Sequence, residues 1–362
     1  MRRARERIID AMGRMLRSLD VFAGIGGITH GLRDVAVPVM YCELDEYCVS
    51  ILDHLMLTAA IPSAPIHHDI RTLVSVPEDI DIIVAGIPCT GFSTAGKRRG
   101  LDDVQSGLYS HVLRLVQNVK PPYVFFENVA AIRSGGMRII LRDLEDEGYT
   151  CRWMTLYARD VGAPHRRNRW FMLASKSGRP PATPLPRGDV ARDWTSEPVD
   201  IPRMGPFTNT TRKSLGALGN AAVPDQVRAA YMWLCMNWDD ANEHNETKKF
   251  PERTDVDLGI VLRPMNVFRE ERHRREERHR RTIPVDEDIH IRMWGTPRKS
   301  AINSNVVLTV RGAKDLATQV RFDIRTPPGD TIYRHPNPRW VEWLMGFPRG
   351  WLGLIDVARN EE

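Results

Sequence analysis

The first 175 residues alternate between short apolar runs and segments with helical spacing, and this alternation constrains the fold more than any other feature. The run at 80–85 is rich in β-branched residues, which is typical of a parallel strand covered on both faces. Strands that alternate with helices predict an α/β fold built on a doubly wound, mostly parallel sheet. The expected strands are 16–22, 39–43, 66–69, 80–85, 123–126 and 170–174, and the expected helices are 25–33, 46–57, 104–119, 137–144 and 224–238.

Composition excludes several classes of protein. The 362 residues suffice for two or three domains. No stretch of about 18 apolar residues occurs, so a membrane span is not expected. The basic N-terminus carries Glu6 and Asp10 and lacks the apolar segment of a secretory signal. Five scattered cysteines without a CxxC pair argue against a disulfide framework or a structural zinc site. We therefore expect a cytoplasmic protein.

The charge balance is mildly basic. Lys and Arg number 51 against 46 Asp and Glu, which gives a formal net charge of +5. Such an excess permits a polyanionic partner but does not require one.

A glycine-rich turn, DVFAGIGG, starts at Asp20, between the first expected strand and helix. Its glycines allow a ligand to approach the backbone. Thr29 stands at the third glycine position of the dinucleotide fingerprint, which disfavours a nicotinamide oxidoreductase. Glu43 ends the next strand, where a carboxylate can accept hydrogen bonds from ribose hydroxyls, and Asp69 ends the third, where it could receive the exocyclic amine of adenine. The alternative is a tight turn with two solvated carboxylates.

Cys89 lies in the sequence GIPCTGFS, directly after the 80–85 strand. A cysteine at a strand end, between a rigid proline and a glycine-rich loop, is placed like a nucleophile. Many lone cysteines are instead inert core residues. The basic residues 97–99 follow closely and either hold phosphates beside the nucleophile or form an ordinary solvated surface.

Two further motifs carry charge at strand ends. Glu127 follows the aromatic 123–126 strand, so desolvation is expected to raise its pKa, as a general acid requires. The alternative places Glu127 at the surface, with Asn128 as a helix N-cap. Arg167 and Arg169 are two residues apart, so on an extended chain they point the same way and could orient a base or a carboxylate. Their alternative is a basic surface.

These motifs, in this order, resemble the cytosine-C5 DNA methyltransferase family of phage and bacterial type. The resemblance covers residues 18–230 and includes Gly-Asn-Ala at 219–221, followed by Val223-Pro224. It implies an enzyme dependent on S-adenosylmethionine, with the Rossmann-like fold of class I methyltransferases and no metal. The cofactor-binding residues that it implies are Asp20, Phe22, Gly24, Gly26, Gly27, Glu43, Asp69, Ile70, Pro88, Asn220 and Ala221.

The resemblance also implies a mechanism. A Cys89 thiolate would add to C6 of cytosine and make C5 nucleophilic. Glu127 would hold or protonate N3, and Arg167, in a catalytic set that includes Arg169, would contact the base oxygen and orient Glu127. The base must leave the duplex to react, so double-stranded DNA is the expected partner. The candidate DNA contacts are Ser93, Lys97, Arg98, Arg99 and Asn128.

The order of the motifs departs from most of the family, because residues 170–218 are too few for a recognition domain between Arg169 and the Gly-Asn-Ala motif. The tail carries MWGTP and NPRWVEWLMGFPRGW, which resemble phage-type recognition regions. The expected organisation is a catalytic domain (1–175), a linker or irregular segment (176–207), the Gly-Asn-Ala motif and helix that complete the catalytic domain (208–238), a charge-rich connector with a duplicated EERHRR (239–283), and a target-recognition or accessory module (284–362).

Three alternatives stay open. The tail could form an accessory domain with its own core, since its tryptophans have helical spacing. The enzyme could methylate tRNA with the same pocket, or be a non-catalytic DNA-binding relative. Thr90 and His165 each stand where the family commonly has glutamine.

We expect a monomer, with a cognate restriction endonuclease as a candidate partner.

Overall fold

The protein is described by a computed structural model at residues 14–88, 107–181, 194, 196–205, 208–238 and 335–353. Its centre is a seven-stranded sheet in the order β3-β2-β1-β4-β5-β7-β6. β7 is the one strand of this sheet that runs opposite to the other six, so the prediction of a mostly parallel α/β fold is confirmed. The strands are β1 (Leu16–Val21), β2 (Ala36–Cys42), β3 (Ile66–His67), β4 (Ile82–Gly86), β5 (Tyr123–Val129), β6 (Thr150–Tyr157) and β7 (Asn168–Ser175).

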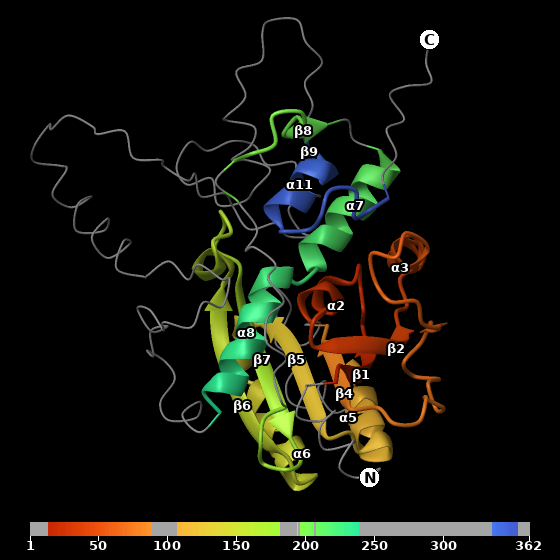
Figure 1. Cartoon of the computed structure of the whole chain (residues 1–362), viewed down its shortest axis with the longest axis vertical. Coiled ribbons are helices and arrows are strands. Elements are labelled where there is room, and N and C mark those ends of the chain that lie inside the picture. The colour runs from red at the N-terminus through yellow and green to blue at the C-terminus, as the bar shows by residue number, and fades with distance from the viewer. Residues whose placement is uncertain are drawn as a thin grey trace, which may run out of the picture.

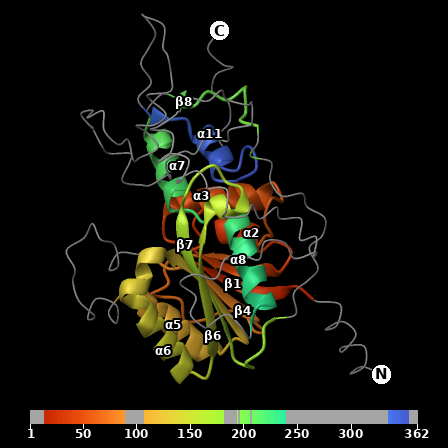
Figure 2. The ribbon, with the colours of Figure 1, turned by 90° about the vertical axis from the view of Figure 1, so that its left-hand side faces the viewer.

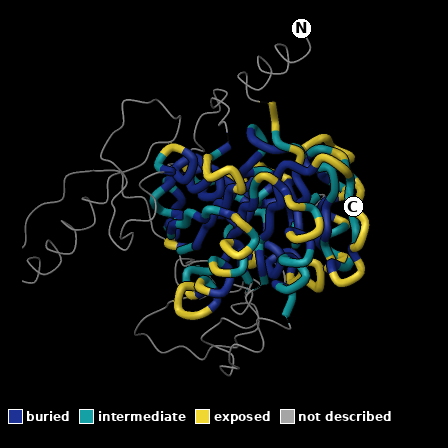
Figure 3. Tube along the Cα trace, turned by 90° about the horizontal axis from the view of Figure 1, so that it is seen from below, coloured by how far each residue is buried: buried dark blue, intermediate teal, exposed yellow. Residues whose placement is uncertain are grey.

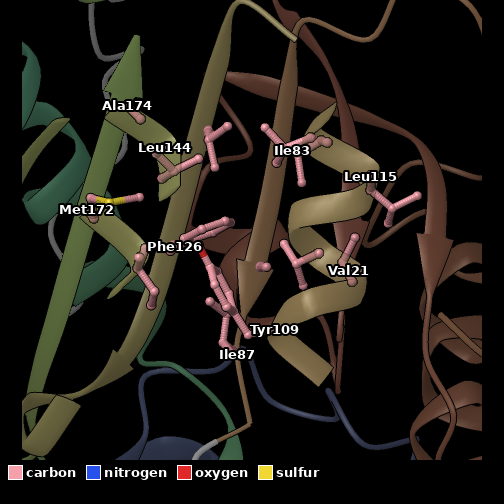
Figure 4. Close-up of a cluster of buried hydrophobic side chains, with 14 of the residues drawn as sticks. Val21, Ile83, Ile87, Tyr109, Leu115, Phe126, Leu144, Met172 and Ala174 are labelled. Atoms are coloured by element: carbon pink, nitrogen blue, oxygen red, sulfur yellow. The ribbon is translucent and has the colours of Figure 1, made fainter. Parts of the chain in front are cut away.

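Helices cover both faces of the sheet. α5 (Leu108–Val119) and α6 (Gly136–Asp146) lie on one face, and α8 (Pro224–Met236) lies on the other (Figure 2). Their apolar side chains meet the strands in two separate clusters, of which Figure 4 shows the one under α5 and α6. Strands buried on both faces explain why the runs at β4 and β5 are almost wholly apolar.

Local chemistry fixes several boundaries as predicted. α3 (Glu46–Leu57) begins where expected because the Asp45 carboxylate accepts hydrogen bonds from the backbone of Tyr47 and Cys48. α8 begins at Pro224, a residue that suits the first helical position. Further short elements are α2 (Gly27–Gly31), η1 (Ala130–Ser134) and η2 (Ala158–Val161).

The sequence did not predict β6 or α7 (Asn209–Asn220). β6 (TCRWMTLY) mixes polar and apolar residues, because it is the edge strand of the sheet and only three of its eight residues are buried. α7 is rich in threonine and glycine, which are poor helix formers, and it is stabilised by burial of its second half.

The C-terminal segment 335–353 packs into the catalytic core. Its strand β9 (His335–Pro336) pairs with β8 (Met204–Gly205), and its helix α11 (Pro338–Leu344) lies beside α7 (Figure 1). The Trp194 indole donates a hydrogen bond to the carbonyl of Trp343, 3.1 Å away. These segments share one apolar cluster with α3, and Figure 3 shows buried stretches in the interior with exposed turns around them.

This arrangement bears on two parts of the expected organisation. The described part of 284–362 has no core of its own, because its buried side chains belong to the cluster that includes α3. The described part of 176–207 is irregular but attached, because it pairs with β9 and carries Trp194. The EERHRR duplication and MWGTP lie outside the described residues. Among the described helices, none has the length and apolarity needed to cross a membrane.

Candidate active site

Three strand ends meet at one edge of the sheet. In the strand registers, Val21 of β1 is opposite Ala85 of β4, and Gly86 is opposite Glu127 of β5. The chain proceeds outward from β1 in one direction through β2 and β3, and in the other through β4 and β5. The carboxyl ends of β1 and β4 therefore form a topological switch point, where ligands bind in sheets of this kind.

The glycine-rich turn after β1 has a left-handed backbone at three positions. Phe22 has φ 54°, Gly24 has φ 56° and Gly26 has φ 76°. A left-handed Phe22 is unusual and points to a functional constraint. Glu43 holds this turn, because one carboxylate oxygen accepts from the backbone N–H of Gly24 at 2.7 Å and the other from Asp45 at 2.8 Å.

The space beside the turn is open at one point and tightly filled at another. A Cβ added at Gly24 would meet nothing within 4 Å. A Cβ added at Gly27 would lie 2.6 Å from the carbonyl oxygen of Ala222. The turn thus touches the Gly-Asn-Ala region through Gly27, where Ala221 is half-buried and Asn220 is exposed.

Asp20 lies beneath the turn. Its two carboxylate oxygens accept hydrogen bonds from the hydroxyls of Ser18 and Thr29, each at 2.6 Å. Burial raises its pKa to about 6. The structure thus shows Asp20 supporting the turn through Thr29, a contact that the sequence analysis did not anticipate.

The third strand end carries Asp69 and Ile70. The Asp69 carboxylate is bound by the guanidinium of Arg71, and these hydrogen bonds lower its pKa to about 2. Ile70 is buried against the α5 face of the sheet. Pro88, at the end of the described part of its loop, is half-buried.

Glu127 is buried at the end of β5 and paired with one arginine. Arg169 Nε lies 2.8 Å from its Oε1, and the carboxyl is only 9% exposed. Burial raises the pKa of Glu127, while the positive charges of Arg169 and Arg167 oppose the rise. The surface alternative for Glu127 is therefore wrong, and so is a capping role for Asn128, which lies within β5 and is 1% exposed. Burial also makes Asn128 a poor candidate for DNA contact.

Arg167 occupies a different place from the one predicted. Its guanidinium is buried and donates from Nη2 to the carbonyls of Gly219 and Ala221, at 3.1 and 2.6 Å. Arg169 therefore pairs with Glu127, and Arg167 connects the same loop to the Gly-Asn-Ala motif. Gln226 of α8 reinforces this loop by donating to the Arg167 carbonyl at 2.9 Å. No motif in the sequence pointed to Gln226.

Cys89 and the loop residues Ser93, Lys97, Arg98 and Arg99 lie outside the described residues. The backbone N–H of Ile87 donates to the Glu127 carbonyl at 3.2 Å, so the chain leaves β4 beside Glu127 two residues before Cys89. The four cysteines that the structure describes are buried thiols, and burial raises the pKa of Cys42 and Cys151 to about 12. The described residues contain no group of three or more His, Cys, Asp or Glu side chains that could hold a metal.

The chain is similar to known proteins of one family. The model of the C-5 cytosine-specific DNA methylase family matches residues 16–351. A Type II methyltransferase, M.CviJI of Paramecium bursaria Chlorella virus IL3A, is 32% identical over 94% of this chain and 98% of its own length. M.XorII of Xanthomonas oryzae is 31% identical over 47% of this chain and 43% of its own length. A solved DNA modification methyltransferase encoded within an E. coli prophage is 29% identical, with a TM-score of 0.36 over 45% of this chain and 47% of its own.

A match over most of the chain shows the family. The chain belongs to the C-5 cytosine-specific DNA methylases, and it is an enzyme that methylates C5 of cytosine in DNA. The family implies the use of S-adenosylmethionine as methyl donor.

Proposed function

We propose that Cys89 is the nucleophile of this methyltransferase, that Glu127 is its acid, and that the turn after β1 binds S-adenosylmethionine. The observation that supports this most is the buried Glu127–Arg169 pair, at the strand end beside the one that leads into Cys89. A carboxyl with a raised pKa at this point suits a group that must hold a proton for a base nitrogen.

The cofactor site fits its proposed occupant. S-adenosylmethionine supplies an electrophilic methyl group when bound. Gly24 offers open space with a left-handed backbone, and Glu43 presents a half-exposed carboxylate at the same turn. Each Glu43 oxygen accepts one backbone hydrogen bond and keeps a further lone pair for a ribose hydroxyl. The Asp69 carboxylate already accepts hydrogen bonds from Arg71, so fewer of its lone pairs are left to accept others. We propose that the remaining lone pairs contact the adenine.

The residues on the base side activate the cytosine ring for methyl transfer. The Cys89 sulfur forms a bond to C6 of the cytosine, and the electron pair displaced from the C5–C6 double bond makes C5 nucleophilic. Glu127 donates its proton to N3 and so limits the negative charge on the ring. After the methyl group has been transferred to C5, the C5 proton passes to solvent as the S–C6 bond breaks, and N3 returns its proton to Glu127. These steps restore the ring, the thiolate and the acid.

We propose that Arg169 is a positioning residue in this step. Its ion pair fixes the Glu127 carboxyl while leaving the pKa above its usual range. Arg167 positions the Gly-Asn-Ala motif, which the resemblance places at the methionine end of the cofactor. The preferred substrate is double-stranded DNA, from which the cytosine is flipped, and the enzyme acts as a single chain.

Covalent trapping tests the proposal. The wild-type enzyme is incubated with labelled cofactor and a duplex that contains 5-fluorocytosine in its target sequence, found first by bisulfite sequencing of DNA from cells that express the protein. Fluorine at C5 cannot leave as a proton does, so an adduct stable to denaturation is expected. Cys89→Ala should give no adduct, whereas Cys48→Ala, on α3, should retain it. An active enzyme that forms no adduct, or a Cys89→Ala variant that still methylates, contradicts the proposal. Labelling of tRNA in place of duplex DNA would contradict the proposed substrate and identify RNA in its place.

A further inference from the structure

We infer that Trp351, from the C-terminal segment, is a positioning residue for the cofactor turn. The inference rests on the proposed cofactor site. The Trp351 indole N–H donates to the carbonyl of Ile25 at 2.7 Å, and the side chain is 2% exposed. Ile25 lies between the two left-handed glycines of the turn. A side chain from the far end of the chain therefore fixes a peptide group at the centre of the cofactor site.

The bond to Ile25 complements the one made by Glu43. Glu43 accepts from the N–H of Gly24, and Trp351 donates to the carbonyl of the next residue. The turn is thus held at two consecutive residues by side chains from different parts of the fold. Removing either hydrogen bond should widen the range of conformations that the free turn adopts. The turn must then lose this conformational freedom when it binds a ligand, which lowers the affinity.

Ring contacts reinforce the placement. The Trp351 ring lies 4.7 Å from the ring of His30 and 5.3 Å from that of Phe347, centre to centre. A Cβ added at Gly26 would lie 3.5 Å from the Trp351 ring, and one at Gly27 would lie 3.4 Å from the Phe347 ring. The C-terminal segment therefore lies directly against the two glycines that follow Ile25.

A buried carboxylate braces Trp351 itself. Glu342 is 1% exposed, and its two oxygens accept from the backbone N–H groups of Leu352 at 2.7 Å and Gly350 at 3.3 Å. These residues flank Trp351 on both sides. Burial of a carboxylate is unfavourable without such donors, so the glutamate and the turn around Trp351 depend on each other.

The same segment is also tied to the base side. His165 Nε2 donates to the carbonyl of Leu344, at the end of α11, at 3.1 Å. Burial lowers the pKa of His165 to about 3, so the imidazole is neutral and carries its proton on Nε2. His165 lies two residues before Arg167. The C-terminal segment therefore spans both sides of the active site and sets the cofactor turn relative to the arginine loop.

Trp351→Phe tests the inference, with Trp343→Phe as its matched control. Phenylalanine keeps an aromatic ring but leaves the buried Ile25 carbonyl without its donor. Trp343 belongs to the same segment and is half-buried, and its ring packs near Trp340 rather than on the cofactor turn. We expect Trp351→Phe to raise the Kd for S-adenosylmethionine, measured by calorimetry, and its KM, each by about tenfold. The kcat should stay within about twofold, and Trp343→Phe should change none of these.

A reaction without cofactor separates positioning from general damage. Addition of a thiolate at C6 lets the C5 hydrogen exchange with water, so release of tritium from DNA labelled at C5 reports the base side alone. Trp351→Phe should release tritium at the wild-type rate. An unchanged Kd, or a tritium release that falls as much as cofactor affinity, overturns the inference. Calorimetry needs no turnover, so failure of the wild-type enzyme to methylate would count against the proposed function and leave this test standing. If Trp351→Phe does not fold, Glu342→Gln replaces it, and a Kd raised about threefold is expected.

Discussion

The proposed active site has two sides that differ in composition: a cofactor side around the turn after β1, and a base side around Glu127. On the cofactor side, backbone groups and glycines form the surface. The Glu43 carboxylate that binds the Gly24 N–H is half-exposed, and the buried Asp20 carboxylate supports the turn from beneath through Thr29. On the base side, ionisable side chains are buried together, with Glu127 against Arg169 and with Arg167 nearby. Backbone and small residues suit the binding of a large ligand, whereas buried charges suit stabilisation of charge during a reaction. Changes on the cofactor side should therefore alter affinity, and changes on the base side should alter the rate of the chemical step.

The largest effect is expected for Glu127→Gln. The amide keeps the size of the side chain but cannot deliver a proton to N3, so kcat should fall by about 10²–10⁴-fold with little change in the KM for S-adenosylmethionine. Steady-state kinetics on the target duplex measure both quantities. The control is Glu145→Gln on α6, an exposed residue far along the sequence from any site motif. A kcat within threefold of wild type would exclude Glu127 as the acid.

Arg169→Ala should destabilise the protein and disturb the chemistry together. Removing one partner of a buried ion pair leaves the carboxylate uncompensated, at an expected loss of about 3–5 kcal/mol in the free energy of unfolding. The pKa of Glu127 should rise further, because Arg169 opposes the effect of burial. Urea denaturation measures the free energy of unfolding, and the pH profile of kcat measures the pKa of Glu127.

Arg167→Ala should instead raise the KM for the cofactor, because the hydrogen bonds of Arg167 go to the Gly-Asn-Ala motif. Equal effects of both variants on both quantities would show that the two sides are not separate.

Gly27→Ala should weaken the cofactor side without touching a charge. Its Cβ would lie 2.6 Å from the backbone oxygen of Ala222, which cannot move like a flexible side chain. We expect a loss of about 1–3 kcal/mol in stability and a higher KM for the cofactor. Gly135→Ala is the matched control, since a Cβ there meets nothing within 4 Å and the φ angle of −165° lies outside the left-handed region. Similar melting temperatures for the two variants would contradict the close approach at Gly27.

The smallest expected effect is the pH dependence contributed by His165. Its pKa is lowered to about 3 in the folded protein from an ordinary 6.5, so the unfolded chain binds a proton that the folded one does not. Its stabilising effect is complete above pH 6.5 and decreases as the pH falls toward 3, by about 2 kcal/mol at pH 5. His165→Gln should reduce this loss, measured as the free energy of unfolding at pH 7 and at pH 5. An identical pH dependence in both proteins would show that His165 titrates normally.

Most of the sheet could be predicted from the sequence because strands buried on both faces are marked by continuous apolar runs. β6 escaped prediction because its Arg152 and Thr155 interrupt the pattern at a sheet edge. The place where the C-terminal segment packs could not be predicted, for another reason. Helical spacing of Trp340 and Leu344 shows that one face is buried, but it does not show against what, and the partner proved to be the core beside α3 and α7.

The candidate site shows the same limit. Strand ends placed Glu127 and the glycine turn at one edge of the sheet, as predicted. Which arginine meets Glu127 depends on the register of β5 and β7, in which Glu127 is opposite Phe171 and Arg169 is therefore its diagonal neighbour. That register is set by pairing between distant segments, which no local pattern in the sequence encodes. The contacts of Trp351 and Gln226 were missed for the same reason, since their partners are backbone carbonyls far away in the chain.

Exchange of the cytosine C5 hydrogen without cofactor, measured side by side for Glu43→Ala and Glu127→Gln, tests the division of the site most directly. We predict that Glu43→Ala releases tritium from C5-labelled target DNA within about twofold of the wild-type rate while its affinity for S-adenosylmethionine falls. Glu127→Gln should bind the cofactor normally and lose most of the exchange. Loss of exchange in Glu43→Ala, or its retention in Glu127→Gln, would contradict the separation of a binding side from a reacting side.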